Sequence, residues 1–490
     1  MKKVIVIGSG FSGLASACFL AKSGFDVTVL EKNSSPGGRA RKFEENGFVF
    51  DMGPSWYWMP DVFDRFFAQF GKKTADYYEL VRLDPSYRVF FGKDDVVDLP
   101  TSEKDQEELF ESFEKGSTNS LRKFLKEARY KYEVGINEFV FKPGHSVMEF
   151  AELRLLISAI RLQLFQSMAS HVRKLFKHPK LLKILEFPVL FLGATPQKTP
   201  ALYSLMNYAD MRLGTWYPKK GMFEVVKAMV SLAEELGVTF LYNQEVLKVD
   251  VSDGLAKKVV TASATFEMDI IVGSADYQHL DQQVLEKNYR NYTGKYWESR
   301  VMAPSSLLFY IGLNKRVTNL LHHNLFFDED FNQHAVDIYD KPAWPEKPLF
   351  YVSVPSLTDN TLAPEGHENV FILIPLAPGL EDNEEKRQFY FDLVMNRLEK
   401  LTGQDINKHI IFKRSYAHRD FMSDYHAFKG NAYGLANTLL QTAFLKPKLR
   451  NRNISNFFFT GQLTTPGPGV PPSLISGEVV AKEISKQFLL

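Results

Sequence analysis

Three closely spaced glycines near the N-terminus could perform a specific binding task. They lie in the stretch Gly8-Ser9-Gly10-Phe11-Ser12-Gly13, between an apolar run at Val4–Ile7 and a helical pattern at Leu14–Ser23. Glycines at this spacing allow a tight turn and let a phosphate approach the N-terminus of the helix. A second apolar run, Val27–Leu30, ends at Glu31, whose carboxylate can hold a ribose hydroxyl. The alternative is a glycine turn followed by a solvated glutamate that binds no ligand. That alternative does not require a strand, a helix, a second strand and an acidic residue in this order, so the sequence predicts a dinucleotide-binding site.

A second glycine pair and an arginine narrow the choice of dinucleotide. They lie in the block Glu31-Lys32-Asn33-Ser34-Ser35-Pro36-Gly37-Gly38-Arg39. Nicotinamide dehydrogenases do not need this block, whereas in an FAD site the Arg39 guanidinium can bind the pyrophosphate. The alternative for Arg39 is a surface ion pair. A later turn, Gly53-Pro54-Ser55, lets the backbone pass close to a flat ring, and the aromatic residues after it are interpreted as pocket wall or core. We therefore expect FAD.

The composition is that of a globular protein. The chain has 490 residues, 45% of them hydrophobic and 14% aromatic, which is enough for two or more packed units. Its net charge of +1 offers no general attraction for a polyanion, so we expect no nucleic-acid partner. The single cysteine, Cys18, excludes an intrachain disulfide and a cysteine-rich zinc site, and suits a reducing cytoplasm.

Two uncharged stretches resemble membrane segments. Val4–Ala21 follows two lysines as a signal peptide would, but its glycines interrupt the apolar core. Asn453–Gly477 contains four prolines and cannot run as a spanning helix. We expect no segment that crosses a bilayer.

The middle of the chain has helical and charged composition. Thr101–Glu133 shows apolar faces on either side of a hinge at Gly116. Ala151–Leu190 carries seven lysines and arginines against two glutamates, with an apolar stripe at helical spacing made of Leu153, Leu156, Ile157, Ile160, Leu164 and Met168. Such a helix lies on an anionic membrane surface or packs into an ordinary core, and both interpretations stay open.

The remaining pattern predicts further sheet. A helix is expected at residues 221–236, parallel strands at 238–241, 246–249 and 269–275, and β-rich blocks at 306–313, 350–354 and 370–375. A helix at 384–401, a strand at 457–460 and a helix at 472–486 complete the chain. We predict an α/β fold of several domains: a discontinuous Rossmann-like FAD-binding domain (1–80, 205–280 and 425–490), a helical membrane-facing insertion (81–204) and a β-rich substrate domain (281–424).

Taken together, these features resemble the flavin-dependent carotenoid desaturases of the bacterial phytoene-desaturase type, within the amine-oxidase-like FAD proteins. The resemblance runs from end to end. It rests on the glycine turn, the Glu31–Arg39 block, Gly214-Thr215-Trp216-Tyr217-Pro218, the strand at 269–277 and, most specifically, the segment Gly461–Gly477.

The resemblance implies positions for the cofactor. It places Ser9, Phe11, Ser12, Glu31, Lys32, Gly38 and Arg39 around the adenosine and diphosphate, Val246 beside the adenine, Gly461 and Gln462 near the ribityl chain, and Gly469, Val470 and Pro471 against the flavin ring. A helix that begins there would stabilise the negative charge of reduced flavin. Pro468 departs from the family pattern, which often has a small residue there, and removes one backbone donor.

The reaction implied by the resemblance is dehydrogenation of a C–C bond next to a polyene. A hydride passes to the flavin and the neighbouring carbon loses a proton. The substrate is a linear carotenoid, with phytoene preferred and later-step substrates, such as a hydroxycarotenoid or γ-carotene desaturated at the 3,4 bond, as the alternative. We expect a long apolar tunnel, peripheral contact with the cytoplasmic side of a membrane, and oxygen or a quinone as electron acceptor.

No catalytic residue can be assigned from the sequence. His322, His323, Asp51, Asp276 and His418 are candidates for a base. The adjacent histidines lack the spacing of a helical metal site, so we expect no metal, and no Gly-x-Ser-x-Gly elbow supports a serine hydrolase. Two rival functions share the fold: an amine oxidase with an aromatic cage for a cation, and an isoprenoid-binding escort protein without catalysis.

Overall fold

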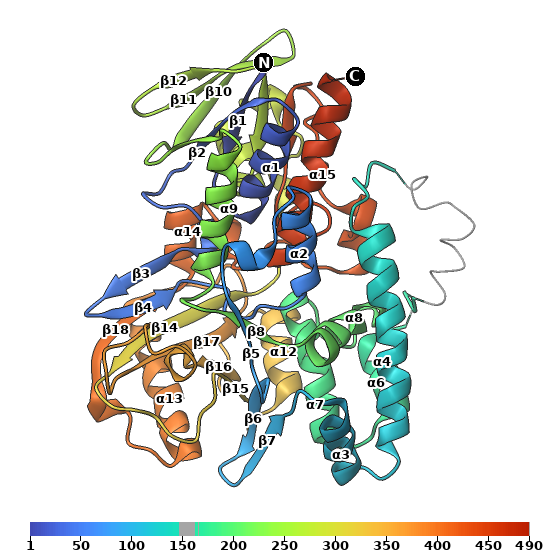
Figure 1. Ribbon diagram of the computed structural model, residues 1–490, viewed down its shortest axis with the longest axis vertical. Coiled ribbons are helices and arrows are strands. Elements are labelled where there is room, and N and C mark those ends of the chain that lie inside the picture. The colour runs from blue at the N-terminus through green and yellow to red at the C-terminus, as the bar shows by residue number, and fades with distance from the viewer. Residues whose placement is uncertain (147–161, 165, 490) are drawn as a thin grey trace.

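The computed structural model describes residues 1–146, 162–164 and 166–489. It has an upper part that carries both chain termini and a lower part built on a large sheet, with a group of helices beside them (Figure 1). The predicted α/β fold is confirmed.

A five-stranded parallel sheet forms the centre of the upper part. Its order is β19 (Phe457–Phe459), β13 (Ile270–Gly273), β1 (Lys3–Ile7), β2 (Asp26–Leu30) and β9 (Thr239–Leu241). Val6 of β1 lies opposite Val29 of β2 and Val272 of β13, and all three are buried. Apolar runs of this kind are typical of parallel strands covered on both faces. The sheet unites three distant parts of the chain.

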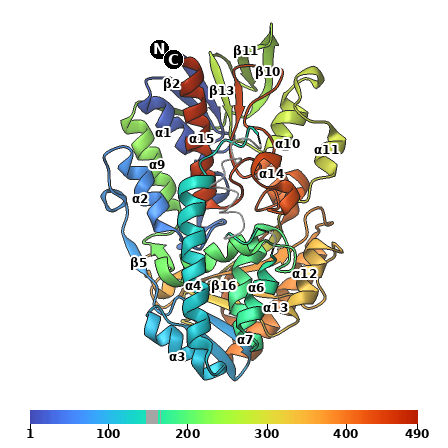
Figure 2. The same cartoon turned by 90° about the vertical axis from the view of Figure 1, so that its right-hand side faces the viewer.

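Helices cover one face of this sheet. They are α1 (Phe11–Lys22), α9 (Phe223–Glu235) and α15 (Val470–Phe488), with α2 (Pro60–Ala68) beside them. Helices α1 and α15 run side by side in both views (Figures 1 and 2). The other face packs against an antiparallel sheet of β10 (Val246–Ser252), β11 (Leu255–Thr261) and β12 (Thr265–Glu267), and against α10 (Tyr277–His279) and α11 (Gly294–Glu298).

The lower part is built on a seven-stranded sheet. Its order is β18 (Ile410–Tyr416), β14 (Ser305–Leu313), β17 (Glu368–Leu376), β16 (Phe350–Ser353), β15 (His323–Phe326), β6 (Tyr87–Gly92) and β7 (Asp95–Leu99). One face packs against α13 (Glu384–Thr402). The other packs against α6 (Met168–Leu175) and α7 (Pro179–Glu186).

The helical region begins later than predicted. Residues 81–204 were expected to be helical, yet β6 and β7 form a hairpin of the large sheet. The reason is local: Tyr87, Val89, Val97 and Leu99 alternate with more exposed residues, and this period of two favours strands. Helices α3 (Glu103–Phe113) and α4 (Ser117–Val134) then follow, with Gly116 in the left-handed region between them (φ 84°). Helix α4 runs along the molecule in Figure 2.

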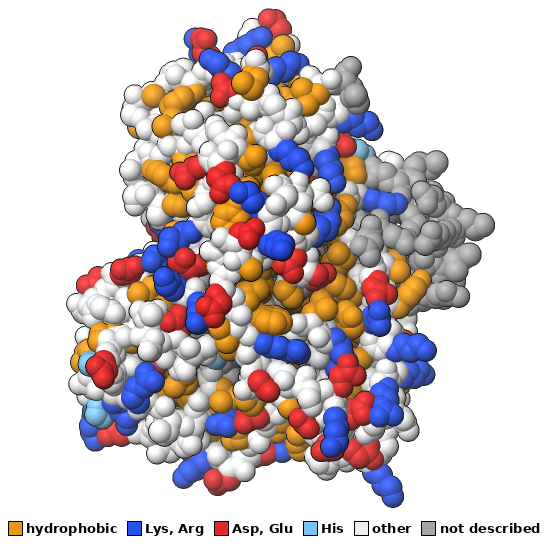
Figure 3. Space-filling view, in the orientation of Figure 1, with side chains coloured by type: hydrophobic (Ala, Val, Ile, Leu, Met, Phe, Trp, Pro, Cys, Tyr) orange, Lys and Arg blue, Asp and Glu red, His pale blue; other side chains and the backbone are white. Residues whose placement is uncertain are grey.

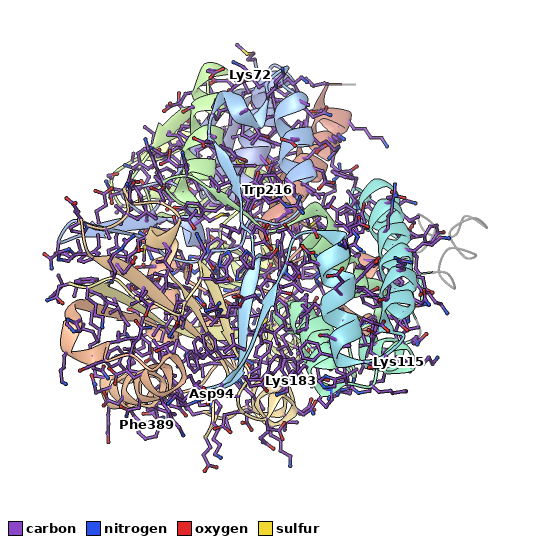
Figure 4. The ribbon with its side chains drawn as sticks, turned by 60° about the horizontal axis from the view of Figure 1, so that its bottom comes forward. Lys72, Asp94, Lys115, Lys183, Trp216 and Phe389 are labelled. Atoms are coloured by element: carbon purple, nitrogen blue, oxygen red, sulfur yellow. The ribbon has the colours of Figure 1, made fainter. Side chains whose placement is uncertain are left out.

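Smaller elements connect the two parts. They are the pairs β3 (Lys42–Glu45) with β4 (Phe48–Asp51) and β5 (Leu80–Arg82) with β8 (Trp216–Pro218), and the helices α8 (Leu205–Tyr208), α12 (Phe331–Tyr339) and α14 (His418–Tyr425). Trp216, from the predicted Gly214–Pro218 motif, lies between the upper helices and the lower sheet (Figure 4).

The predicted apolar stripe falls mostly outside the described residues. Of its members only Leu164, in a turn, and Met168, buried at the start of α6, can be placed. In the described part of the chain, none of the helices combines the length and apolar character needed to span a bilayer.

Candidate active site

One large cavity, of about 960 Å³, lies between the upper and lower parts. The site residues predicted from the sequence line it with a single exception. Those that line it are Gly8, Ser9, Gly10, Phe11, Ser12, Glu31, Lys32, Gly38, Arg39, Gly53, Pro54, Ser55, Val246, Gly461, Gln462, Gly469, Val470 and Pro471.

Gly13 is the exception and has a packing role. A Cβ at Gly13 would lie 2.1 Å from the carbonyl oxygen of Gly8, so only glycine lets α1 approach the end of β1 this closely. Gly8 itself has φ of 97°, a conformation that suits glycine. The first turn of α1 has no side-chain cap, and its residues Phe11 and Ser12 line the cavity. This helix N-terminus suits an anionic group.

Glu31 is fixed at the polar end of the cavity. Its Oε2 accepts hydrogen bonds from Ser9 N (2.9 Å) and Ser9 Oγ (2.5 Å), and its Oε1 accepts one from Asn33 N (2.9 Å). The carboxylate is buried although it is held only by neutral groups here. Glu31 directly follows β2, where a carboxylate can accept a hydrogen bond from a ribose hydroxyl.

Arg39 is a half-buried cation whose Nε has no hydrogen-bond partner. Its Nη2 donates to the carbonyl oxygen of Asn431 (3.2 Å), and its Nη atoms donate to the Gln462 amide oxygen when that oxygen faces them (3.0 and 3.1 Å). Its Nε is buried without a partner. Burial raises the pKa of Asp276 to about 6, while the nearby Arg39 charge opposes that rise. A buried, unpaired guanidinium N–H favours a bound acceptor at this point.

The C-terminal segment brings a second helix N-terminus to the cavity. Gly461 follows β19 with φ of 109°, and its N–H donates to Ser476 Oγ of α15 (3.0 Å). Helix α15 begins after Gly469, which has no side-chain cap and a φ of 110°. Pro471 and Pro472 in this first turn have no N–H, so the helix dipole and the Val470 N–H are what favour negative charge here. The turn after β19 and the start of α15 therefore meet at the cavity wall.

The rest of the cavity is mainly apolar. Its walls come from the helical region, the large sheet and the loop before α15, and include Trp56, Trp58, Met59, Ile136, Leu164, Leu205, Met206, Leu308, Leu373, Phe421, Phe444 and Leu445. The aromatic residues after Ser55 divide between the two interpretations: Trp56 and Trp58 line the cavity, and Tyr57 is core. Ionisable residues cluster at the opposite end, around Glu31 and Arg39; they include Lys32, Glu245, Asp276, His279, Asp424 and His426.

Sequence reasoning missed polar residues of the apolar part, among them Ser306 of β14, Tyr351 of β16 and Tyr433. Strand alternation places Tyr351 on one face of its strand with Ser353. That signal alone does not reveal which face meets a cavity.

Only one candidate base lines the large cavity, and that is Asp276. The Asp51 carboxylate accepts hydrogen bonds from Met222 N (2.7 Å) and Phe223 N (3.0 Å), so it caps α9. The His418 ring bonds through Nε2 to the carbonyl oxygen of Ala377 (2.8 Å), away from the cavity. These two residues therefore have structural partners.

The adjacent histidines are buried and neutral. His322 Nδ1 lies 2.8 Å from Thr358 Oγ1, and His323 Nδ1 lies 2.6 Å from Tyr351 Oη. Burial lowers the pKa of His322 to about 3 and that of His323 well below its ordinary value. Among the described residues, no three His, Cys, Asp or Glu side chains are grouped to hold a metal ion.

The sequence pattern of one protein family, described as flavin containing amine oxidoreductase, matches residues 11–485. The chain belongs to this family. The protein is an FAD-dependent oxidoreductase, and its site fits the cofactor: two uncapped helix N-termini, a buried carboxylate and an unpaired guanidinium N–H converge on one cavity.

Relatives of this flavoprotein include carotenoid desaturases. It is 43% identical to a carotenoid 3,4-desaturase of Haloarcula japonica over 98% of this chain and 97% of the relative. It is 30% identical to a zeta-carotene-forming phytoene desaturase of Myxococcus xanthus over 99% of this chain and 94% of the relative. Among solved structures, an oxidoreductase from Methanosarcina mazei matches with a TM-score of 0.65 at 14% identity, covering 98% of this chain and 100% of that chain. The last likeness shows the fold.

Proposed function

We propose that the protein is a carotenoid desaturase that acts late in carotenoid synthesis, at the 3,4 bond of a linear carotenoid. The observation that carries the proposal is the 43% identity, along nearly the whole chain, to the carotenoid 3,4-desaturase of Haloarcula japonica. The cavity supports it, because its ionisable lining residues gather at one end and leave an apolar space for a hydrocarbon.

The residues divide into two groups by task. Ser9, Glu31 and Arg39, with the N-termini of α1 and α15, would hold the cofactor. FAD supplies the hydride acceptor when it is bound. The apolar walls formed by the large sheet and the helical region would bind the polyene and exclude water, so the reacting carbons are kept from side reactions.

Phytoene is the second candidate substrate. It is favoured by the Myxococcus xanthus relative, a phytoene desaturase that is 30% identical over 99% of this chain. The two candidates differ in the bond that is oxidised and in the length of the polyene already present.

The amine-oxidase and escort alternatives have less support. Trp56, the aromatic residue best placed to cage a cation, is stacked on the His323 ring with centroids 4.1 Å apart, so one of its faces is covered. An escort protein would have no use for the buried, unpaired Arg39 donor. Stoichiometric FAD binding would count against the escort function, and turnover of small amines without carotenoid turnover would contradict a desaturase.

We also propose peripheral contact with a membrane on the cytoplasmic side, with oxygen or a quinone as the electron acceptor. Leu440 and Leu445 are large apolar side chains left 79% and 41% exposed; Leu440 precedes the cavity-lining segment 442–445, and Leu445 is its last residue. Hydrophobic side chains are also exposed across the middle of the face in Figure 3. The basic residues after the predicted stripe support contact less, because Arg173 pairs with the buried carboxylate of Glu186.

Anaerobic mixing tests the proposed function directly. The FAD-loaded protein in liposomes is mixed with a hydroxylated γ-carotene or with phytoene, and bleaching of the flavin absorbance is followed. Bleaching by the hydroxylated carotenoid supports the proposal. Bleaching by phytoene alone would identify phytoene, the second candidate, as the substrate. Bleaching by neither compound contradicts both candidates.

A further inference from the structure

A hydrogen-bonded tyrosine and histidine lie under the apolar part of the cavity. Tyr351 of β16 lines the cavity, and its Oη is 2.6 Å from Nδ1 of His323 on β15. His323 is paired in register with Ser353, two residues from Tyr351, so all three side chains share one face of the sheet. Burial raises the pKa of Tyr351, so its hydroxyl is protonated. With the proton of the neutral imidazole on Nε2, Nδ1 accepts the hydrogen bond from this hydroxyl.

Apart from its hydrogen bond to Tyr351, the His323 side chain makes packing contacts. It is fully buried, stacks on Trp56 and meets the His322 ring edge-on, with centroids 4.5 Å apart. Its Nε2 is buried without a partner. Burying such a polar group costs free energy, which an apolar pair at the same positions would avoid.

A second, much smaller cavity of about 30 Å³ is lined by Ser353, the residue opposite His323 in the sheet register. Gly53 and Ser55 line both cavities. The hydroxyls of Ser353 and Ser55 hydrogen-bond to Tyr351 and oppose the rise in its pKa. The small cavity has room for a single water molecule, and its wall is polar enough to bind one.

The small cavity is also lined by Asp51, His322 and the exposed residue Lys220. Groups with exchangeable protons, Ser55, Ser353 and Asp51, therefore line a space between Tyr351 and an exposed residue.

We propose that Tyr351 and His323 accept the proton that the substrate loses, and that the small cavity beside Ser55 and Asp51 carries it to solvent. This inference rests on the proposed function. One substrate C–H bond would break with its electron pair, and FAD, when bound, would supply the hydride acceptor. In the same step the adjacent C–H bond would break, its electron pair would become the second bond of the new C=C, and its proton would go to Tyr351 Oη. The proton of Tyr351 moves to His323 Nδ1.

A weak base suffices for this step. As the hydride leaves, delocalised positive charge develops along the polyene, and a C–H bond beside such charge is strongly acidic. The neutral imidazole has a free Nδ1 lone pair, whereas an imidazolium would not. Return of the proton through Tyr351, Ser353 and a water in the small cavity restores the resting pair.

Two variants separate proton transfer from hydrogen bonding. Tyr351→Phe removes the hydroxyl, and His323→Asn keeps an acceptor for Tyr351 but cannot take a proton. Tyr310→Phe is the matched control, because Tyr310 is also buried in the same sheet, on β14, and its hydroxyl donates to the carbonyl oxygen of Met52 (2.7 Å), away from the cavity.

The first readout is the single-turnover rate of flavin reduction by the carotenoid. Because a positioned base contributes roughly 10²–10⁴-fold, both variants should slow reduction by about 100-fold or more while substrate affinity stays within about threefold. The wild-type rate should show a solvent deuterium isotope effect that Tyr351→Phe removes. Reduction rates in both variants equal to that of Tyr310→Phe would overturn the proposal.

The second readout needs no turnover. Nitrogen NMR of the histidine-labelled holoprotein should show His323 with its proton on Nε2 and a bare Nδ1, and Tyr351→Phe should shift that resonance. A proton on Nδ1 would overturn the relay. If neither carotenoid reduces the flavin of the wild type, the proposed function fails. The tautomer of His323 is measured without turnover, so it still decides whether His323 Nδ1 accepts the hydrogen bond from Tyr351.

Discussion

Gly477 of α15 lies directly against Ser12 of α1. A Cβ added at Gly477 would come within 2.4 Å of the Ser12 carbonyl oxygen and 2.9 Å of the Ser16 backbone nitrogen. The two helix backbones therefore touch, and this contact fixes both uncapped N-termini at the same cavity. The relative position of the two helix N-termini depends on a glycine that does not line the cavity.

We expect Gly477→Ala to push α1 and α15 apart. The overpacking should lower the free energy of unfolding by about 1–3 kcal/mol, and FAD should be lost more readily because the two N-termini no longer converge. Thermal unfolding with and without added FAD, and flavin absorbance after desalting, measure both effects. Gly294→Ala is the control, since nothing within 3.9 Å would meet its Cβ. Equal FAD retention in both variants would contradict this role.

Arg39→Gln should weaken FAD binding. The change removes a charged donor set that includes the buried, unpaired Nε. A hydrogen bond to a charged group contributes about 1.5–3 kcal/mol, so FAD should bind roughly tenfold or more weakly. Arg41→Gln is a suitable control, because Arg41 pairs with Asp424 and does not line the cavity. Titration of the apoprotein with FAD measures the difference, and the assignment of Arg39 fails if the two variants bind FAD alike.

Asp210 should make stability depend on pH. It is buried, its Oδ2 accepts from Tyr87 Oη (3.0 Å), and burial raises its pKa to about 7. The folded state thus holds the proton more tightly than the unfolded state, in which the pKa is about 4. Its stabilising effect is complete below pH 4 and is lost as the pH rises through 7.

Asp210→Asn mimics the protonated carboxyl and removes that dependence. Relative to the variant, the wild type should lose stability between pH 5 and pH 8. Urea unfolding at the two pH values, compared between the two proteins, isolates Asp210 from the buried histidines. A constant difference between the proteins across this range would show that Asp210 does not titrate as described.

Much of the upper part could be predicted because its signals are local. The glycine turn, the apolar strands and Glu31 lie within one short stretch, and the same holds for the start of α15 after Gly469. The β6–β7 hairpin was missed although its alternation of buried and more exposed residues is also local; its pairing with β15, more than two hundred residues later in the chain, has no local signal. Gly13 was placed in the cofactor site because spacing does not distinguish a glycine that approaches a ligand from one that approaches a backbone carbonyl.

The catalytic part of the site depends on tertiary contacts. His323 was a candidate base, yet nothing in the sequence joins it to Tyr351, 28 positions away. The pairing of β15 with β16 brings them together, and the loop after Ser55 places Trp56 over the imidazole. The sequence shows which residue types are present, but the register of β15 against β16 decides that His323 and Tyr351 lie next to each other.

Membrane contact should depend on exposed leucines more than on basic residues. Leu440→Ser combined with Leu445→Ser should reduce flotation with anionic liposomes, since apolar burial drives interfacial binding. The paired variant Lys174→Glu and Lys177→Glu should have the smaller effect, because the Lys177 Nζ already donates to the Arg173 carbonyl oxygen. The opposite ranking of the two double variants would assign the contact to the basic patch.

The central claim is that the protein introduces a C=C bond into a linear carotenoid at the 3,4 position. The most direct test is to incubate the FAD-loaded protein in liposomes with a hydroxylated γ-carotene and, separately, with phytoene, and to analyse the products by chromatography with absorption spectra. We expect the hydroxylated substrate to give a product with a longer chromophore. Conversion of phytoene alone would contradict the late-step assignment, and no new chromophore from either substrate would contradict desaturation itself.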